Sequence, residues 1–132
     1  MTSELSPTEL ATVAAQAAAD KLGFDIAAYN VAELVPLAEV FLICSANNER
    51  QVAAIVDAVA EELAKAGEKL DFREGRRDDQ WVLLNYPDIV IHIQHKEARD
   101  FYALDRLWGD CPRIQLDVDV PADGQNIRAG VI

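Results

Sequence analysis

Two neighbouring stretches of the chain, residues 81–86 and 89–95, alternate in the pattern of β-strands. Pro87 and Asp88 lie between them and suit the centre of a tight turn. A two-residue turn would make one face of the hairpin wholly apolar. The cross-strand pairs on that face would be Tyr86–Ile89, Leu84–Ile91 and Val82–Ile93. We therefore predict that Val82, Leu84, Ile89, Ile91 and Ile93 belong to the core.

The opposite face of this hairpin is mixed in character. Its expected cross-strand pairs are Trp81–Gln94, Leu83–His92 and Asn85–Val90. A face with a large indole, an imidazole and two amides is either covered by a helix or binds a partner. The helix expected over residues 96–108 is the obvious cover, and in that case Trp81 would be an ordinary core residue.

The remaining pattern predicts helices and strands in alternation. Ser6 and Glu9 form a capping box with Pro7 at the first helical position, which predicts a helix over residues 7–22 that ends at Gly23. Strands are expected over residues 25–31, 39–44 and 70–74, and a second helix follows the loop 45–51 and ends near residue 66. Ser45 or Asn47 would cap that helix, although a loop before a helix N-terminus is also a candidate anion site.

This order of elements predicts a single α/β domain over residues 1–112, with a mixed sheet of about five strands flanked by helices. Residues 113–132 read as a C-terminal tail. Ile114, Leu116, Val118 and Val120 alternate, so part of this tail could instead add an edge strand.

Charge narrows the classes of partner. The 132 residues include 23 acidic and 12 basic ones, for a formal net charge of −11. Such a surface repels nucleic acid and offers no basic groove for phosphates, so we expect no direct nucleic-acid binding. It suits a basic protein partner, and it is equally common in soluble proteins. We found neither a membrane-spanning segment nor a signal peptide, which predicts a cytoplasmic protein.

Three catalytic interpretations were weighed. His92 and His95 fall on opposite faces of one strand, so they cannot hold a metal together. Cys44 could serve as a nucleophile with His92 as base, but an inert buried thiol is the simpler interpretation. Asp117 and Asp119 could bind magnesium in a nucleotidyl-transferring enzyme, although no phosphate loop precedes them. We expect no catalytic residues, metal or cofactor.

Several blocks in register identify a family. They are residues 41–45 (FLICS), 49–52 (ERQV), 73–75 (REG), 81–84 (WVLL), 88–92 (DIVIH), 99–102 (RDFY) and 107–108 (LW). In this order and spacing the chain closely resembles the ribosomal silencing factor family, RsfS or Iojap, over roughly residues 5–112. Departures from its usual pattern are Glu39, Ala46, Asn48 and the run Asn85-Tyr86-Pro87.

The resemblance implies a fold like that of nucleotidyltransferases without their catalytic carboxylates. It implies binding to the large ribosomal subunit, at the basic ribosomal protein numbered fourteen. A factor bound there blocks joining of the small subunit and represses translation when nutrients are short. It also implies that copies of the chain can form a homodimer. The alternatives are a nucleotidyltransferase-like enzyme and a generic protein-interaction adaptor.

The mixed hairpin face is the predicted contact surface. Its candidate partner-binding residues are Trp81, Leu83, Asn85, His92, Arg99 and Tyr102. An exposed indole beside a leucine gains free energy when it is buried, and indoles are frequent at interface hot spots. His92 and Asn85 would supply directional hydrogen bonds, and Arg99 and Tyr102 would extend the surface from the following helix.

Overall fold

The computed structural model describes residues 5–34, 38–76 and 79–118. Within them, one mixed sheet has the strand order β3-β4-β5-β2-β1-β6. Its strands are β1 (Phe24–Asn30), β2 (Val40–Ala46), β3 (Phe72–Glu74), β4 (Trp81–Asn85), β5 (Ile89–His95) and β6 (Arg113–Ile114). The central pair β2–β5 is parallel and the other pairs are antiparallel. The predicted α/β fold, a mixed sheet flanked by helices, is confirmed, with six strands described instead of about five.

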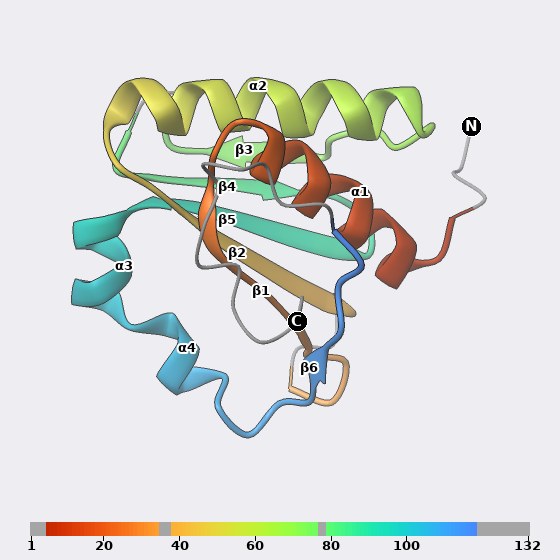
Figure 1. Cartoon of the computed structure of the whole chain (residues 1–132). Coiled ribbons are helices and arrows are strands. Elements are labelled where there is room, and N and C mark those ends of the chain that lie inside the picture. The colour runs from red at the N-terminus through yellow and green to blue at the C-terminus, as the bar shows by residue number, and fades with distance from the viewer. Residues whose placement is uncertain (1–4, 35–37, 77–78, 119–132) are drawn as a thin grey trace.

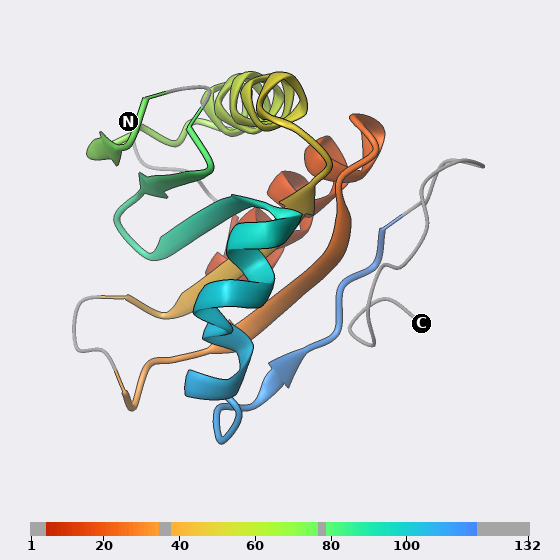
Figure 2. The same cartoon turned by 90° about the vertical axis from the view of Figure 1, so that its left-hand side faces the viewer.

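Helices lie on both faces of this sheet (Figures 1 and 2). On one face α1 (Pro7–Asp20) and α2 (Glu49–Lys65) pack side by side. The short helices α3 (Lys96–Tyr102) and α4 (Leu104–Leu107) lie on the other face. Two hydrophobic clusters result, a large one beneath α1 and α2 and a smaller one that includes Tyr29, Val90 and Trp108. No described helix has both the length and the apolar character needed to cross a membrane.

The hairpin β4–β5 has the predicted register. Trp81 pairs with Gln94, Leu83 with His92 and Asn85 with Val90, and the apolar pairs alternate between them. The amide of Tyr86 donates to the carbonyl of Ile89 at 2.9 Å, which closes the turn. Val82, Leu84, Ile89, Ile91 and Ile93 are all buried in the large cluster. The prediction that they form core is therefore confirmed.

Of the two predicted helix caps, the one of α1 is confirmed and the one of α2 is wrong. The capping box of α1 is present, since Ser6 Oγ accepts from the amide of Glu9 at 3.1 Å and the Glu9 carboxylate accepts from the amide of Ser6 at 2.8 Å. The prediction that Ser45 or Asn47 caps α2 is wrong. Asn48 is the cap, and its Oδ1 accepts from the amide of Gln51 at 2.9 Å. Strand β2 continues to Ala46, so Ser45 lies within the strand and not in the loop. Its hydroxyl oxygen accepts a hydrogen bond from Arg99 of α3.

The predicted helix over residues 96–108 is interrupted. Ala103 has a left-handed backbone with φ of 49°, and it separates α3 from α4. Trp108 is consequently buried while Phe101 is 81% exposed, so these two rings do not share one helical face. The break brings the carboxylate of Asp105 to the guanidinium of Arg99, a contact that a straight helix would not make.

The sheet continues past residue 112. Arg113 and Ile114 form β6 and pair with Tyr29 and Ala28 of β1, so the segment read as a tail begins with the predicted edge strand. Leu116 and Val118 are buried against the large cluster. The rest of the predicted tail, including Asp119 and Val120, lies outside the described residues.

Candidate docking surface

The mixed face of the hairpin is covered unevenly. Helix α3 lies over β5 and β2, and Trp108, just after α4, packs edge-on against Tyr29 and Phe41 with ring centres 5.6 and 4.8 Å away. Strands β3 and β4 extend beyond this cover, as Figure 2 shows. The sequence left open whether this face is covered by a helix or is accessible to a partner. Both occur, because α3 covers the centre of the face and its edge at β3 and β4 stays accessible.

Trp81 marks the boundary between the covered and the accessible part. Its ring is partly exposed and lies 4.7 Å from the ring of Tyr102, which is 51% exposed. Its indole Nε1 donates to Nδ1 of His92 at 3.1 Å, so the ring is fixed from both sides. Leu83 and Asn85 follow on the same face of β4 and are partly exposed. One continuous strip on this face is therefore formed by four of the predicted residues: Tyr102, Trp81, Leu83 and Asn85.

Sequence reasoning missed three neighbours of this strip. Phe72 and Glu74 of β3 pair with Asn85 and Leu83, so their side chains share that face, and Phe72 is 50% exposed. Phe101 stacks edge-on against Tyr102 at 5.0 Å. We call the set Phe72, Trp81, Leu83, Asn85, Phe101 and Tyr102 the docking surface. Strand β3 has only three residues, too few for alternation to reveal which face Phe72 occupies.

A shallow pocket of about 230 Å³ lies in this surface between β3 and β4. Its lining residues are Glu74, Gly75, Trp81 and Leu83. Gly75 has φ of 88°, and a Cβ there would approach the carbonyl oxygen of Trp81 to 2.7 Å. Only glycine fits this turn, so the close approach of the turn to Trp81 is built into the backbone.

His92 lies beneath the docking surface and not on it. It is 6% exposed and packs against Phe41 and Trp108. Because Nδ1 accepts from Trp81, the neutral ring carries its hydrogen on Nε2. Burial lowers the pKa of His92 to about 4, so the ring is neutral at physiological pH. Its role in the geometry is to hold the indole of Trp81.

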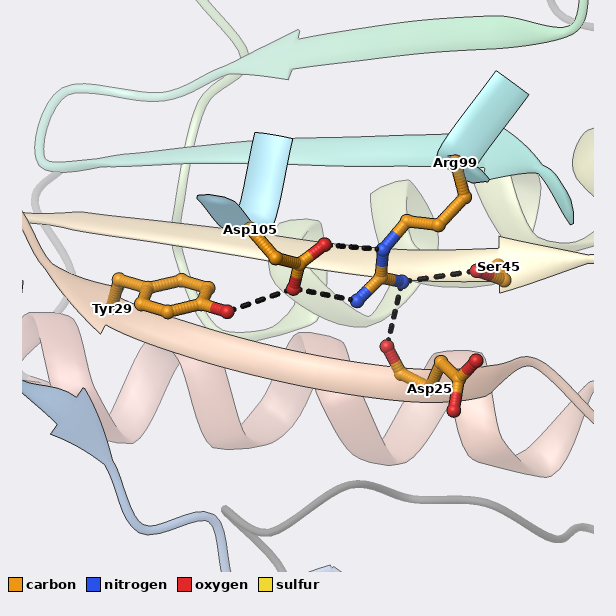
Figure 3. A network of polar contacts seen from close by, with 5 residues as sticks. All are labelled: Asp25, Tyr29, Ser45, Arg99 and Asp105. Carbon is orange, nitrogen blue, oxygen red and sulfur yellow. Dashed lines mark hydrogen bonds and ion pairs between the residues drawn. The ribbon is translucent and has the colours of Figure 1, made fainter. Parts of the chain in front are cut away.

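Arg99 is buried as well, at 4% exposure, and belongs to a polar network (Figure 3). Its Nε and Nη2 donate to the two carboxylate oxygens of Asp105 at 2.8 and 2.9 Å. Its Nη1 donates to the carbonyl of Asp25 at 2.7 Å and to Ser45 Oγ at 3.0 Å. The hydroxyl of Tyr29 donates to Asp105 at 2.7 Å. Burial and that hydrogen bond raise the pKa of Tyr29 to about 12, which keeps the hydroxyl a donor.

With this geometry in view, the chain can be placed among known proteins. A family model described as "Ribosomal silencing factor during starvation" matches residues 4–129. The chain belongs to this family. The match extends past residue 112 and so includes β6.

Individual relatives agree. The ribosomal silencing factor RsfS of Halalkalibacterium halodurans is 35% identical over 113 residues, which cover 86% of this chain and 97% of the relative. RsfS of Bacillus subtilis is 37% identical over 105 residues, or 80% and 89% of the two chains. A crystal structure of a Chromobacterium violaceum protein superposes with a TM-score of 0.76 at 30% identity, over 80% of this chain and 88% of that one.

The side chains weighed for catalysis in this member of the silencing-factor family are held apart. Cys44 faces the large cluster beneath α1 and α2, whereas His92 faces α3 and α4, so they cannot act as nucleophile and base. Burial raises the pKa of the Cys44 thiol to about 12. Nδ1 of His95 accepts from the amide of Glu97 and caps α3. Among residues 5–34, 38–76 and 79–118, no three His, Cys, Asp or Glu side chains converge on a metal site.

Proposed function

We propose that this protein represses translation by binding the large ribosomal subunit and blocking its joining with the small subunit under nutrient limitation. The observation that carries the proposal is the family match over residues 4–129, together with relatives named ribosomal silencing factors over most of their length. In line with the family resemblance, the contact would be made with the basic ribosomal protein numbered fourteen, by a protein acting in the cytoplasm.

The docking surface supports this proposal. It groups the exposed rings of Phe101 and Tyr102 at the partly exposed Trp81. The half-exposed ring of Phe72 lies at the other end of β4, across from Asn85. Aromatic side chains that stay in water on a folded domain favour burial by a partner, and tryptophan and tyrosine are frequent at binding hot spots. His92 and Arg99, both buried, would then contribute from below by holding Trp81 and α3.

The negative charge of the chain favours a basic protein as the partner of the docking surface. The chain carries a formal net charge of −11, and Glu74 borders the docking surface, where it lines the shallow pocket with Trp81 and Leu83. An acidic domain is attracted to a basic protein over long range, which speeds association at low salt. We expect the association rate to fall as salt is raised, because exposed charges are then screened.

Co-sedimentation with purified large subunits tests the binding step, and a subunit-joining assay tests the block. We expect the protein to pellet with large subunits and to reduce the amount of joined ribosomes when it is added before small subunits. Glu61 lies on α2, at the face of the sheet away from the docking surface. Glu61→Gln therefore changes the surface charge without touching that surface, and it should bind large subunits as the wild type does. Wild-type protein that stays in the supernatant would contradict the proposal, and magnesium-dependent nucleotide transfer would favour the enzyme alternative.

Self-association is a separate part of the proposal. Copies of this chain would form a homodimer, as the family resemblance implies. Sedimentation equilibrium over a range of protein concentrations measures this directly, and a mass of 14.5 kDa at every concentration would show a monomer.

A further inference from the structure

The exposed ring of Tyr102 is carried by a short helix, whose position depends on its contacts with the rest of the domain. Helix α3 has only seven residues, and helices of that length are unstable in isolation. Of its residues only Ala98 and Arg99 are buried. The start of α3 is fixed by its junction with β5 and by the His95 cap. Because Ala98 offers one methyl group, the orientation of the helix beyond that point depends mainly on Arg99.

The guanidinium of Arg99 is bound from three directions. Asp105 of α4, Ser45 of β2 and the backbone carbonyl of Asp25 in β1 together accept four hydrogen bonds from it, at 2.7 to 3.0 Å. A planar group held by acceptors on three elements fixes both the position and the rotation of the helix that carries it. An apolar anchor would allow α3 to slide or turn on the sheet.

The backbone has a left-handed residue at two places that contact Arg99, one at its guanidinium and one at its main-chain carbonyl. Asp25 has φ of 51° at a register shift between β1 and β2, and its carbonyl accepts from Arg99. Ala103 has φ of 49°, and its amide donates to the carbonyl of Arg99 at 3.0 Å. Left-handed geometry is unfavourable for residues other than glycine, and such strain is concentrated at functional sites.

A buried ion pair is a weak source of stability compared with apolar residues of the same shape, so its benefit here is geometric. We propose that Arg99 is the positioning residue of the docking surface. Through its contacts with Asp105, Ser45 and the carbonyl of Asp25 (Figure 3), it sets α3. In that position of α3, Tyr102 packs on Trp81 with ring centres 4.7 Å apart. This inference rests on the proposed function and assigns Arg99 an indirect role in it.

The first test reads the position of Trp81 without any ribosome. The chain has two tryptophans, so 5-fluorotryptophan gives two fluorine resonances, and Trp81→Phe assigns them. Arg99→Lys keeps the charge but cannot make the two-pronged contact with Asp105. We expect it to shift or broaden the Trp81 resonance at a temperature where the protein is folded. Arg50→Lys, at an exposed site on α2, is the matched control and should leave that resonance unchanged.

The second test is a double-mutant cycle in large-subunit binding. If Arg99 acts through Tyr102, Arg99→Lys should weaken binding about tenfold in the wild-type background and less than about twofold beside Tyr102→Ala. Ser45→Ala removes one of the four hydrogen bonds and leaves the ion pair, so it should give a smaller loss of about threefold. It also serves as the variant to measure if Arg99→Lys does not fold.

The outcomes separate this inference from the proposed function. If Trp81→Ala and Tyr102→Ala both bind large subunits as wild type does, the docking surface is wrong and the role of Arg99 falls with it. If those two variants bind weakly but Arg99→Lys lowers affinity by the same factor in both backgrounds, the positioning role alone is overturned. An unchanged Trp81 resonance in Arg99→Lys would also overturn it.

Discussion

The two faces of the sheet are stabilised in different ways. Beneath α1 and α2 the core is mostly aliphatic and rich in alanine, and Tyr86 and Cys44 are its members with a hydroxyl or thiol group. Beneath α3 and α4 the buried residues include His92, Gln94 and Arg99 beside aromatic rings. Neither amide atom of Gln94 has a hydrogen-bond partner among the described residues. The first face depends mainly on volume and shape, whereas on the second the pairings of His92 with Trp81 and of Arg99 with Asp105 add to aromatic packing.

The polar groups buried beneath α3 and α4 make the second face the better candidate for function. Buried polar groups are unfavourable unless each finds its partner, so a chain that needed only stability would fill the site with apolar residues. The pairings instead orient Trp81 and Tyr102 at the edge of the covered area. Four predictions test whether the two faces differ as described.

The largest effect is expected from breaking the buried ion pair. Asp105→Ala would leave the Arg99 guanidinium, 4% exposed, without its carboxylate, and should lower the free energy of unfolding by ~3–5 kcal/mol. Glu61 and Lys65 form an exposed pair on α2, so Glu61→Ala should change stability by less than ~0.5 kcal/mol. Urea unfolding at pH 7 measures both. A loss below ~1 kcal/mol for Asp105→Ala would show that the network has no special weight.

The second effect is a pH dependence due to His92. Its pKa falls from an ordinary 6.5 to about 4 on folding, so the unfolded chain binds the proton more readily between those values. Above pH 6.5 both states are neutral and nothing is lost, whereas stability falls as pH drops towards 4, by ~2 kcal/mol at pH 5. The fall in unfolding free energy from pH 7 to pH 5 should be smaller by about this amount in His92→Gln. Equal falls in the two proteins would contradict the burial of His92.

The third prediction separates binding from stability at Trp81. Because the indole is partly exposed, Trp81→Ala should lower stability by less than the ~3–5 kcal/mol of a core tryptophan, while large-subunit binding weakens by ~2 kcal/mol or more. Thermal unfolding and co-sedimentation measure the two effects. A strongly destabilised variant whose folded fraction binds normally would make Trp81 an ordinary core residue of the second face.

The same contrast explains what could be predicted from the sequence. The hairpin register followed from a two-residue period and a two-residue turn, since a slip of one residue would have exposed Ile91 and Ile93. The break at Ala103 had no such signal, because alanine is a good helix former and takes the left-handed geometry only through tertiary contacts. The burial of Arg99 likewise depends on tertiary contacts. The sequence could therefore place Arg99 and Tyr102 on one helix but could not show that Arg99 is buried.

The smallest effect is expected at Phe72, which the alternation pattern missed. Its ring is half-exposed on the edge strand β3, so Phe72→Ala should leave the melting temperature nearly unchanged. Large-subunit binding should weaken by ~1 kcal/mol, less than for Trp81, because Phe72 lies at the rim of the docking surface. Leu34 is exposed to a similar degree next to β1, where it lines a different pocket with Cys111, so Leu34→Ala is the matched control. Equal affinities for the two variants would confine the docking surface to β4 and α3.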